Sequence, residues 1–178
     1  WLLQRRTHNA GIVDAVWAGC MSASALYYAT VGDGGLVARF MVAMLGGFWG
    51  FRLCMHILAR VLTEHEDGRY RHLREHWGNH QGKFLGFFQA QALSNIYLAI
   101  PFFLIAFNRK ENLSPIEYIG AAVWAISICG EALADAQLKI FKKNPTNKGK
   151  VCDAGLWNYS RHPNYFFESM IWVGYFLV

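Results

Sequence analysis

Five long apolar segments, separated by polar connections, constrain the fold of this chain more than any other feature. They run at about residues 11–31, 37–62, 84–107, 115–138 and from 164 onward. A helix needs about 20 residues to cross the roughly 30 Å of hydrocarbon in a bilayer. Within lipid the backbone must satisfy its own hydrogen bonds, which a helix does. The sequence therefore predicts an all-α, polytopic transmembrane helix bundle with about five visible spans, in a single membrane-embedded domain covering residues 1–178.

The amino-acid composition also supports a membrane protein. Apolar residues make up 54% of the chain, and its charges fall in short intervals instead of being spread over a soluble surface. The net charge of +5 forms no continuous stripe, so we expect no nucleic-acid partner. The chain starts at Trp1 without an initiator methionine and stops inside an apolar segment. We therefore expect a fragment of a longer protein, incomplete at both ends, with membrane lipid around it.

Most of the 17 Lys and Arg residues fall on one face when alternate connections are assigned to the same side. Arg39, Arg109 and Lys110 fall on the other side. Basic residues gather on the cytoplasmic side of membrane proteins. The sequence therefore predicts an integral membrane protein whose two long loops, at residues 63–83 and 139–163, face the cytoplasm.

The polar run D-A-G-L-W-N-Y-S-R-H-P-N-Y-F-F-E, residues 153–168, meets the start of the last apolar segment. Pro163 suits the first turn of a helix, since its missing N–H would have no partner there. Asn164 and Glu168 would then share one helix face. Free backbone N–H groups and polar side chains at this helix start could bind an anion, although Arg161 could equally be a basic juxtamembrane cap. The polar residues at this start are Tyr159, Ser160, Arg161 and His162.

The string G-L-W-N-Y-S-R-H-P-N-Y-F-F-E, with Glu131, Asp135 and Leu138 upstream, resembles the bacterial-type membrane reductases of the steroid 5-alpha-reductase family. The resemblance extends to E-D-G-R-Y at residues 66–70 and G-I-V-D at residues 11–14, so it covers most of the chain. It implies an enzyme that uses NADPH. The R-H-P-x-Y element also resembles that of the isoprenylcysteine methyltransferases, which bind S-adenosylmethionine.

Ionisable residues inside the apolar segments are the second indication of a site. Asp14 lies in the first segment, and Arg52, His56 and Arg60 recur every four residues in the second. Such groups are costly in hydrocarbon and usually face a bundle interior or a cavity. A salt-bridge network that only fixes helix packing is the alternative. A shared ligand cavity accounts for polar faces on several helices more economically.

The reductase interpretation gives these residues roles. Cationic side chains would hold the phosphates of NADPH, while carboxylates and amides would accept bonds from the ribose and the nicotinamide amide. The resemblance implies Asp135, Lys142, Asn164 and Glu168 as cavity residues. The full predicted cofactor set is Asp67, Arg69, Tyr70, Glu131, Asp135, Lys139, Lys142, Tyr159, Ser160, Arg161, His162, Asn164, Tyr165 and Glu168.

The catalytic acid follows the family pattern less closely. The animal enzymes have an adjacent Gln-Glu pair and a Tyr after a His, whereas His56 is followed by Ile57 and the early helix offers Asp14. Reduction of a conjugated C=C needs a donor that stabilises the enolate oxygen. Asp14, if protonated, or a neutral His56 would serve, so both are the predicted catalytic residues.

Two loop motifs have alternative interpretations. His72, His76 and His80 are four apart, but Gly78 is expected to interrupt the helix, so we predict no metal site. In E-D-G-R-Y, Arg69 and Tyr70 could clamp a phosphate and stack on adenine, or the motif could be a helix-capping turn.

The sequence thus predicts an NADPH-dependent oxidoreductase acting on CH–CH bonds, similar to 3-oxo-5-alpha-steroid 4-dehydrogenases, with a lipophilic, steroid-like or other lipid substrate. Its cofactor would enter from the cytoplasm. The first alternative is an S-adenosylmethionine-dependent, isoprenylcysteine-type membrane methyltransferase. The second is a non-catalytic lipid-binding or transport protein, although the chain shows no internal repeat of the kind that many transporters have.

Overall fold

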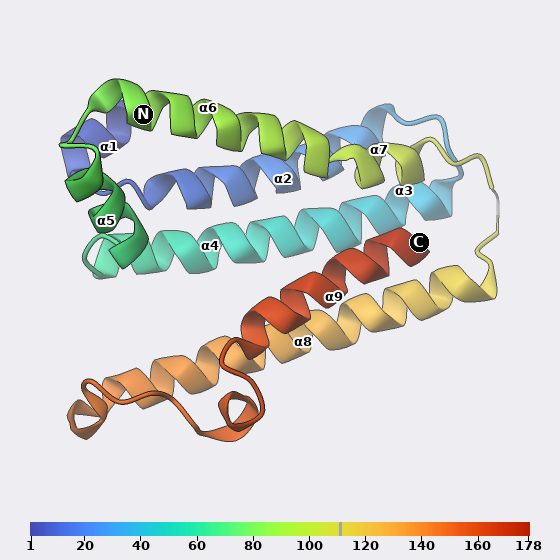
Figure 1. The fold of residues 1–178 in the computed structure, drawn as a ribbon. Coiled ribbons are helices and arrows are strands. Elements are labelled where there is room, and N and C mark those ends of the chain that lie inside the picture. Colours follow the sequence, from blue (N-terminus) through green and yellow to red (C-terminus); the bar gives the residue numbers. More distant parts are fainter. Residues whose placement is uncertain (111) are drawn as a thin grey trace. The chain divides into compact units, whose positions relative to one another are not determined.

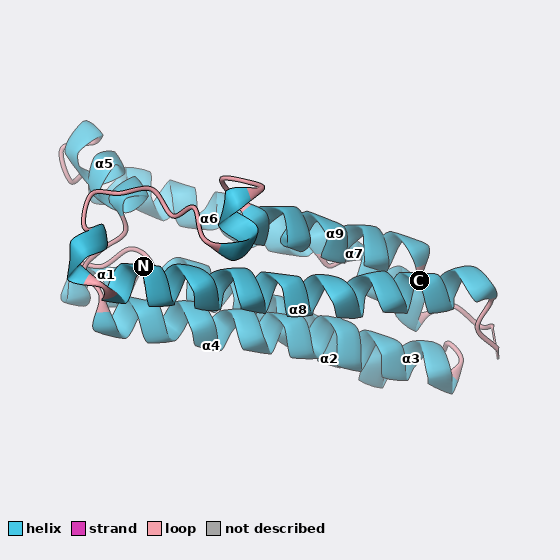
Figure 2. Ribbon diagram, turned by 90° about the horizontal axis from the view of Figure 1, so that it is seen from below, coloured by secondary structure: helices cyan, strands magenta, loops and turns pink. Residues whose placement is uncertain are grey.

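A computed structural model describes residues 1–110 and 112–178 of the chain. The described residues are helical throughout their regular structure and contain no strand (Figure 2). Two compact units make up the chain, Trp1–Glu111 and Asn112–Val178. The expectation of one membrane-embedded domain stays a prediction.

The first unit contains seven of the labelled α-helices (Figure 1). They are α1 (Leu2–Thr7), α2 (Ile12–Val31), α3 (Leu36–Val42), α4 (Phe48–Thr63), α5 (Gly68–His76), α6 (Gln81–Leu98) and α7 (Ile100–Ala106). A π-helical turn, η1 (Ala43–Gly47), joins α3 to α4. The second unit contains α8 (Pro115–Lys143), two short 3-10 turns, η2 (Pro145–Asn147) and η3 (Gly155–Asn158), and α9 (Pro163–Leu177).

Among the described residues, three helical stretches are long and apolar enough to cross a membrane: Leu36–Thr63, Gln81–Ala106 and Pro115–Lys143. An all-α membrane protein, as predicted, is therefore confirmed. The other two expected spans also form helices, α2 with 20 residues and α9 with 15, but neither is among these three stretches. Length and composition thus support three of the five expected spans.

Close approach of small residues packs α2 against the second apolar segment. A Cβ at Gly46 would lie 2.7 Å from Ala25 Cβ, and one at Gly50 would lie 2.6 Å from the backbone nitrogen of Ser22. The Ser22 hydroxyl donates a hydrogen bond of 2.7 Å to the carbonyl oxygen of Gly47 in the π-helical turn. Glycines at this four-residue spacing let helix backbones approach closely.

One end of the first unit is tied together by polar contacts of α1. Gln4 is completely buried, and its Nε2 donates a hydrogen bond of 2.8 Å to Gln81 Oε1 at the start of α6. The Trp1 indole N–H donates a bond of 3.2 Å to the Gln81 carbonyl. These contacts hold α1 beside the start of α6 (Figure 1).

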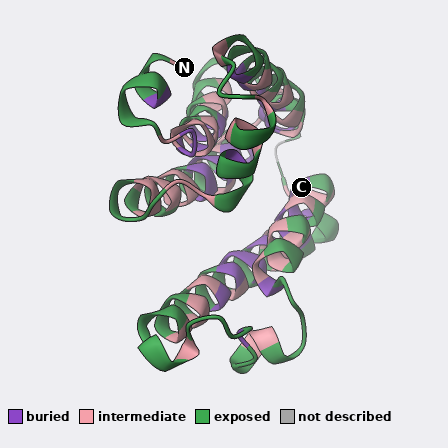
Figure 3. Cartoon of the chain, turned by 60° about the vertical axis from the view of Figure 1, so that its left-hand side comes forward, coloured by how far each residue is buried: buried purple, intermediate pink, exposed green. Residues whose placement is uncertain are grey.

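The second unit is an antiparallel pair, α8 and α9, which pack along much of their length. A Cβ at Gly174 would lie 3.0 Å from the Gly120 carbonyl oxygen, so the two backbones nearly touch there. The Trp124 indole donates a bond of 3.2 Å to the Tyr175 hydroxyl. Figure 3 shows buried residues along the side where these two helices meet.

Candidate functional site

The contact between α8 and α9 forms a helix–helix seam that contains four of the predicted cofactor residues. On α8 the buried positions recur at three- and four-residue spacing: Gly120, Trp124, Ser127, Ile128, Glu131 and Ala134. On α9 they are Pro163, Ile171, Gly174 and Tyr175. Asn164 and Glu168 continue the α9 stripe at the same spacing, and Asp135 follows Glu131 on α8. We call Glu131, Asp135, Asn164 and Glu168 the polar seam.

Burial sets the polar seam apart from an ordinary surface. Glu131 has only 4% of its surface exposed, although a carboxylate is costly to bury. The Asn164 side-chain Oδ1 is buried and accepts no hydrogen bond from the described residues. Buried polar atoms almost always have partners, so an acceptor of this kind calls for a donor. A ligand hydroxyl or amide is such a donor.

The start of α9 is where the proline predicts it, since the helix begins at Pro163. The residues before it are exposed. The Ser160 hydroxyl accepts a hydrogen bond of 3.2 Å from the His162 backbone N–H. The His162 ring stacks on Tyr165, with ring centroids 5.2 Å apart. Tyr159 and Arg161 are exposed, so both side chains are accessible to solvent or to a ligand.

Gln137 and Trp157 hold the preceding loop against α8, and sequence reasoning missed both. Gln137 Oε1 accepts a hydrogen bond of 2.9 Å from the Leu156 backbone N–H. The Trp157 indole donates a bond of 2.9 Å to the Ala134 carbonyl. Gly155 has a positive φ of 60°, and its backbone lies so close to Gln137 that a Cβ there would be 2.4 Å from Gln137 Nε2. A tryptophan within a polar loop was the available signal, because its N–H needs a partner when buried.

In the first unit, the predicted residues Asp14, Asp67, Arg69 and Tyr70 come together. The Tyr70 hydroxyl donates a hydrogen bond of 2.6 Å to Asp14 Oδ1, and Arg69 Nη2 donates one of 3.2 Å to Asp14 Oδ2. Asp67 caps α5 by accepting bonds from the Arg69 backbone N–H, at 2.9 Å, and from Arg69 Nε, at 3.2 Å. Asp14 and Arg69 were assigned separate roles from the sequence, and the fold makes them partners.

Tyr70 is a buried donor in this cluster. Burial raises the pKa of its hydroxyl, and the neighbouring Asp14 carboxylate raises it further, so the phenol keeps its proton. The residue is only 3% exposed and its ring packs edge-on against Phe87, with centroids 6.2 Å apart. Adenine stacking on this ring therefore requires it to leave its cluster. Of the two interpretations of E-D-G-R-Y, the helix-capping turn describes the observed geometry.

Glu66, at the start of the same motif, is a structural ion-pair residue that sequence reasoning did not single out. Its Oε1 accepts bonds from Arg74 Nη2, at 2.7 Å, and from the Ala10 backbone N–H, at 2.8 Å. Burial alone would raise the pKa of this carboxyl, but these bonds outweigh it and lower the pKa below its usual value. Glu66 thereby joins α5 to the start of α2.

His56, the second predicted catalytic residue, is exposed on α4. Arg60, one turn further along the same face, lies with its Nη2 3.8 Å from Asp67 Oδ2. This places the basic face of α4 beside the capping turn of α5. The catalytic role of His56 stays a prediction.

The loop histidines have local roles. Gly78, at a φ of 57°, follows the end of α5 at His76, as expected. The rings of His72 and His76 stack with centroids 6.3 Å apart. His80 caps α6 by accepting a bond of 3.4 Å from the Lys83 backbone N–H. In the part of the chain that the structure describes, no group of three His, Cys, Asp or Glu residues is placed to hold a metal.

Comparison with known families decides the classification. All 178 residues, 1–178, match the family described as "Protein of unknown function (DUF1295)". The chain belongs to the DUF1295 family. This family is related to steroid 5-alpha-reductase-like proteins, so the broader part of the resemblance is confirmed.

One curated protein shows a partial similarity to this DUF1295 chain. It is the probable O-methyltransferase ustE of Ustilaginoidea virens, 40% identical over 52 residues. The match covers 29% of the DUF1295 chain and 18% of ustE, so the chain spans less than a fifth of that relative. No solved structure matches the chain.

Proposed function

We propose that this DUF1295 protein is a membrane reductase that binds NADPH along the polar seam and reduces a C=C bond conjugated to a carbonyl in a lipophilic substrate. The observation that supports it most directly is the buried acceptor at Asn164 Oδ1. Three carboxylate side chains lie along the same seam. A ligand rich in hydroxyl and amide donors fits this set of acceptors.

The residues divide by chemistry in this proposal. Asn164 would accept a hydrogen bond from the carboxamide of the nicotinamide, and Glu131, Asp135 and Glu168 would accept bonds from ribose hydroxyls. Arg161, with its planar guanidinium, suits the pyrophosphate, and Lys139 on α8 adds charge. The bound cofactor would supply hydride to the β-carbon of the substrate. The seam itself orients that group and excludes water from it.

The proton donor is a separate proposal, which rests on the sequence and on contacts within the first unit. Both oxygens of Asp14 already accept hydrogen bonds, from Tyr70 and Arg69, so we propose that Asp14 positions those two side chains. His56 is exposed on α4, and we propose it as the general acid because a neutral imidazole can donate through one ring N–H. A donor there stabilises the negative charge that develops on the enolate.

We propose a cytoplasmic site. The basic residues that surround the C-terminal end of α8 favour that side. A cysteine substituted for Thr146 should react with a membrane-impermeant maleimide in inside-out vesicles and not in right-side-out ones. Reaction only in right-side-out vesicles would place the site on the outer side.

Thermal unfolding of the purified full-length protein tests the cofactor. NADPH at a hundred times its Kd should stabilise the folded state by about 2.7 kcal/mol. Asn164→Ala should weaken NADPH binding about tenfold, as expected for loss of one buried hydrogen bond. Ser169→Ala, an exposed position on the same helix, is the matched control and should leave NADPH binding unchanged. Absence of any stabilisation by NADPH would reject the proposal.

A methyltransferase is the second candidate, and the partial similarity to ustE favours it. S-adenosylmethionine carries no phosphate, so it would use the polar seam without needing Arg161. Stabilisation of the protein by S-adenosylmethionine and not by NADPH would replace the reductase proposal with this one. Retention of that stabilisation in Arg161→Gln would agree with it.

A further inference from the structure

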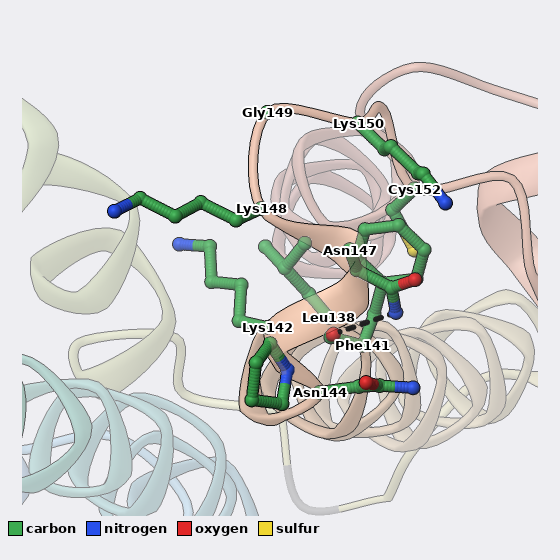
Figure 4. Close-up of a pocket in the computed structure, with 10 residues that line it drawn as sticks. Leu138, Phe141, Lys142, Asn144, Asn147, Lys148, Gly149, Lys150 and Cys152 are labelled. Carbon is green, nitrogen blue, oxygen red and sulfur yellow. Dashed lines mark hydrogen bonds between the residues drawn. The ribbon is translucent and has the colours of Figure 1, made fainter.

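A pocket lies where the chain leaves α8 and folds back over the end of that helix. Its volume is about 410 Å³. It is lined by Leu138, Phe141, Lys142, Asn144, Pro145, Asn147, Lys148, Gly149, Lys150 and Cys152 (Figure 4). We call it the lysine pocket. Neither the predicted catalytic residues nor the polar seam contribute to it.

Hydrogen bonds fix the walls of the lysine pocket. Asn147 Nδ2 donates a bond of 2.9 Å to the Phe141 carbonyl at the last turn of α8, shown dashed in Figure 4. Asn144 Oδ1 accepts bonds from the Thr146 backbone N–H, at 3.1 Å, and from its hydroxyl, at 2.8 Å. Gly149 reverses the chain at a φ of 83°. These hydrogen bonds therefore fix the loop in one conformation against the end of α8.

The lining has two chemical halves. Lys142, Lys148 and Lys150 supply the charge, and Figure 4 shows the first two extending to the same side. Leu138 and Phe141, with the buried Cys152, supply an apolar floor. No acidic residue lines the pocket, and the sequence has none from residue 136 to residue 152. Such a lining suits a ligand with an anionic head and an apolar body.

The pocket lies at the end of a helix that could cross a membrane, and this position favours a lipid as its ligand. It opens at the C-terminal end of Pro115–Lys143, one of the three stretches able to cross a membrane. Lipid headgroups surround such a helix end, and clustered lysines directly beyond a span attract anionic lipids. We propose that the lysine pocket binds the phosphate group of an anionic phospholipid, with its glycerol and first chain carbons against the apolar floor. Inorganic phosphate would make no use of that floor.

This site shares Lys142 with the predicted cofactor set, but the proposal does not rest on the reductase activity. Lys148 and Lys150 are outside the predicted cofactor set, while Lys142 belongs to it. A test on Lys148 and Lys150 therefore leaves the predicted nucleotide contacts intact.

Binding of short-chain phosphatidylglycerol to the full-length protein in detergent is the test, with phosphatidylcholine of the same chain length as the neutral comparison. Removing two lysines in Lys148→Gln/Lys150→Gln should weaken phosphatidylglycerol binding about tenfold to thirtyfold. The control Lys83→Gln/Lys143→Gln removes the same charge from residues that do not line the pocket. It should change the affinity less than threefold. Lys148→Arg/Lys150→Arg should keep the binding.

A second measurement uses the unaltered protein. Phosphatidylglycerol should protect Lys148 and Lys150 from amine acetylation more than it protects Lys143. If the pocket and control variants lose phosphatidylglycerol affinity equally, the binding depends on overall positive charge and not on the pocket, which would overturn the proposal. Equal binding of phosphatidylcholine would overturn it as well. Protection by inorganic phosphate or NADPH, without protection by phosphatidylglycerol, would make this a soluble-phosphate site instead.

Discussion

The Tyr70 hydroxyl donates a hydrogen bond of 2.6 Å to Asp14 Oδ1, which joins α5 to α2 across 56 positions of sequence. A bond to a charged acceptor contributes more than one between neutral groups. Tyr70→Phe keeps the ring in its cluster but removes this bond. We expect the free energy of unfolding to fall by about 1.5–3 kcal/mol, measured by thermal or denaturant unfolding in detergent.

The control for that variant is Tyr118→Phe on α8, where the tyrosine is 63% exposed. It should change the free energy of unfolding by less than about 0.5 kcal/mol. Equal effects of the two substitutions would show that the bond to Asp14 adds no stability.

Glu66 makes stability depend on pH. The bonds from Arg74 and Ala10 lower the pKa of Glu66 below its usual 4.5 despite its burial. A carboxyl with a lowered folded-state pKa stabilises the protein above the unfolded pKa, and that contribution is lost as the pH falls through the folded value. The stability difference between the wild type and Glu66→Gln should thus be constant near neutral pH and shrink below about pH 4.5.

Unfolding curves at a series of pH values check this expectation. Glu64→Gln, at an exposed position just beyond α4, serves as the comparison and should show a much smaller difference at every pH. A Glu66→Gln difference that grows on acidification would contradict the assigned sign.

Gly155 is expected to resist substitution for two separate reasons. An L-residue at its φ of 60° is strained by about 1–2 kcal/mol, and its Cβ would lie 2.4 Å from Gln137 Nε2. Gly149 has a positive φ of 83° with open space around it. Gly155→Ala should therefore lower the free energy of unfolding more than Gly149→Ala does. Similar losses would mean that the Gln137 contact does not hold the loop.

The seam between α8 and α9 depends on Gly130. A Cβ there would lie 2.4 Å from the Phe167 ring, so Gly130→Ala must displace that ring, at a cost of about 1–3 kcal/mol. Phe167 precedes Glu168, so NADPH should also stabilise this variant less. Gly86→Ala on α6 meets nothing within 4 Å and should be neutral or slightly stabilising. Thermal unfolding with and without NADPH measures both effects.

His56→Ala tests the proposed proton donor. Loss of a general acid should lower turnover about 10²- to 10⁴-fold, while stabilisation by NADPH stays unchanged. His65→Ala, another exposed histidine of the first unit, should keep normal turnover. Full turnover by the His56 variant would remove it from the mechanism.

Sequence alone determined the features that depend on local chemistry. Apolar segments of bilayer length gave an all-α membrane protein, and Pro163 marked the first residue of α9. The four-residue spacing of Asn164 and Glu168 placed both on one helix face, which the fold turns toward α8. These properties follow from helix geometry and hydrophobic burial, which act over one or two turns.

Only the tertiary structure decided which distant side chains meet. No local pattern pairs Asp14 with Tyr70, or sets the Gln137 amide against Gly155. The return of the chain over α8, which makes the lysine pocket, depends on the bond from Asn147 to Phe141. Such contacts form only when tertiary packing brings residues that are distant in sequence close together. The spacing of residues along the sequence therefore does not predict them.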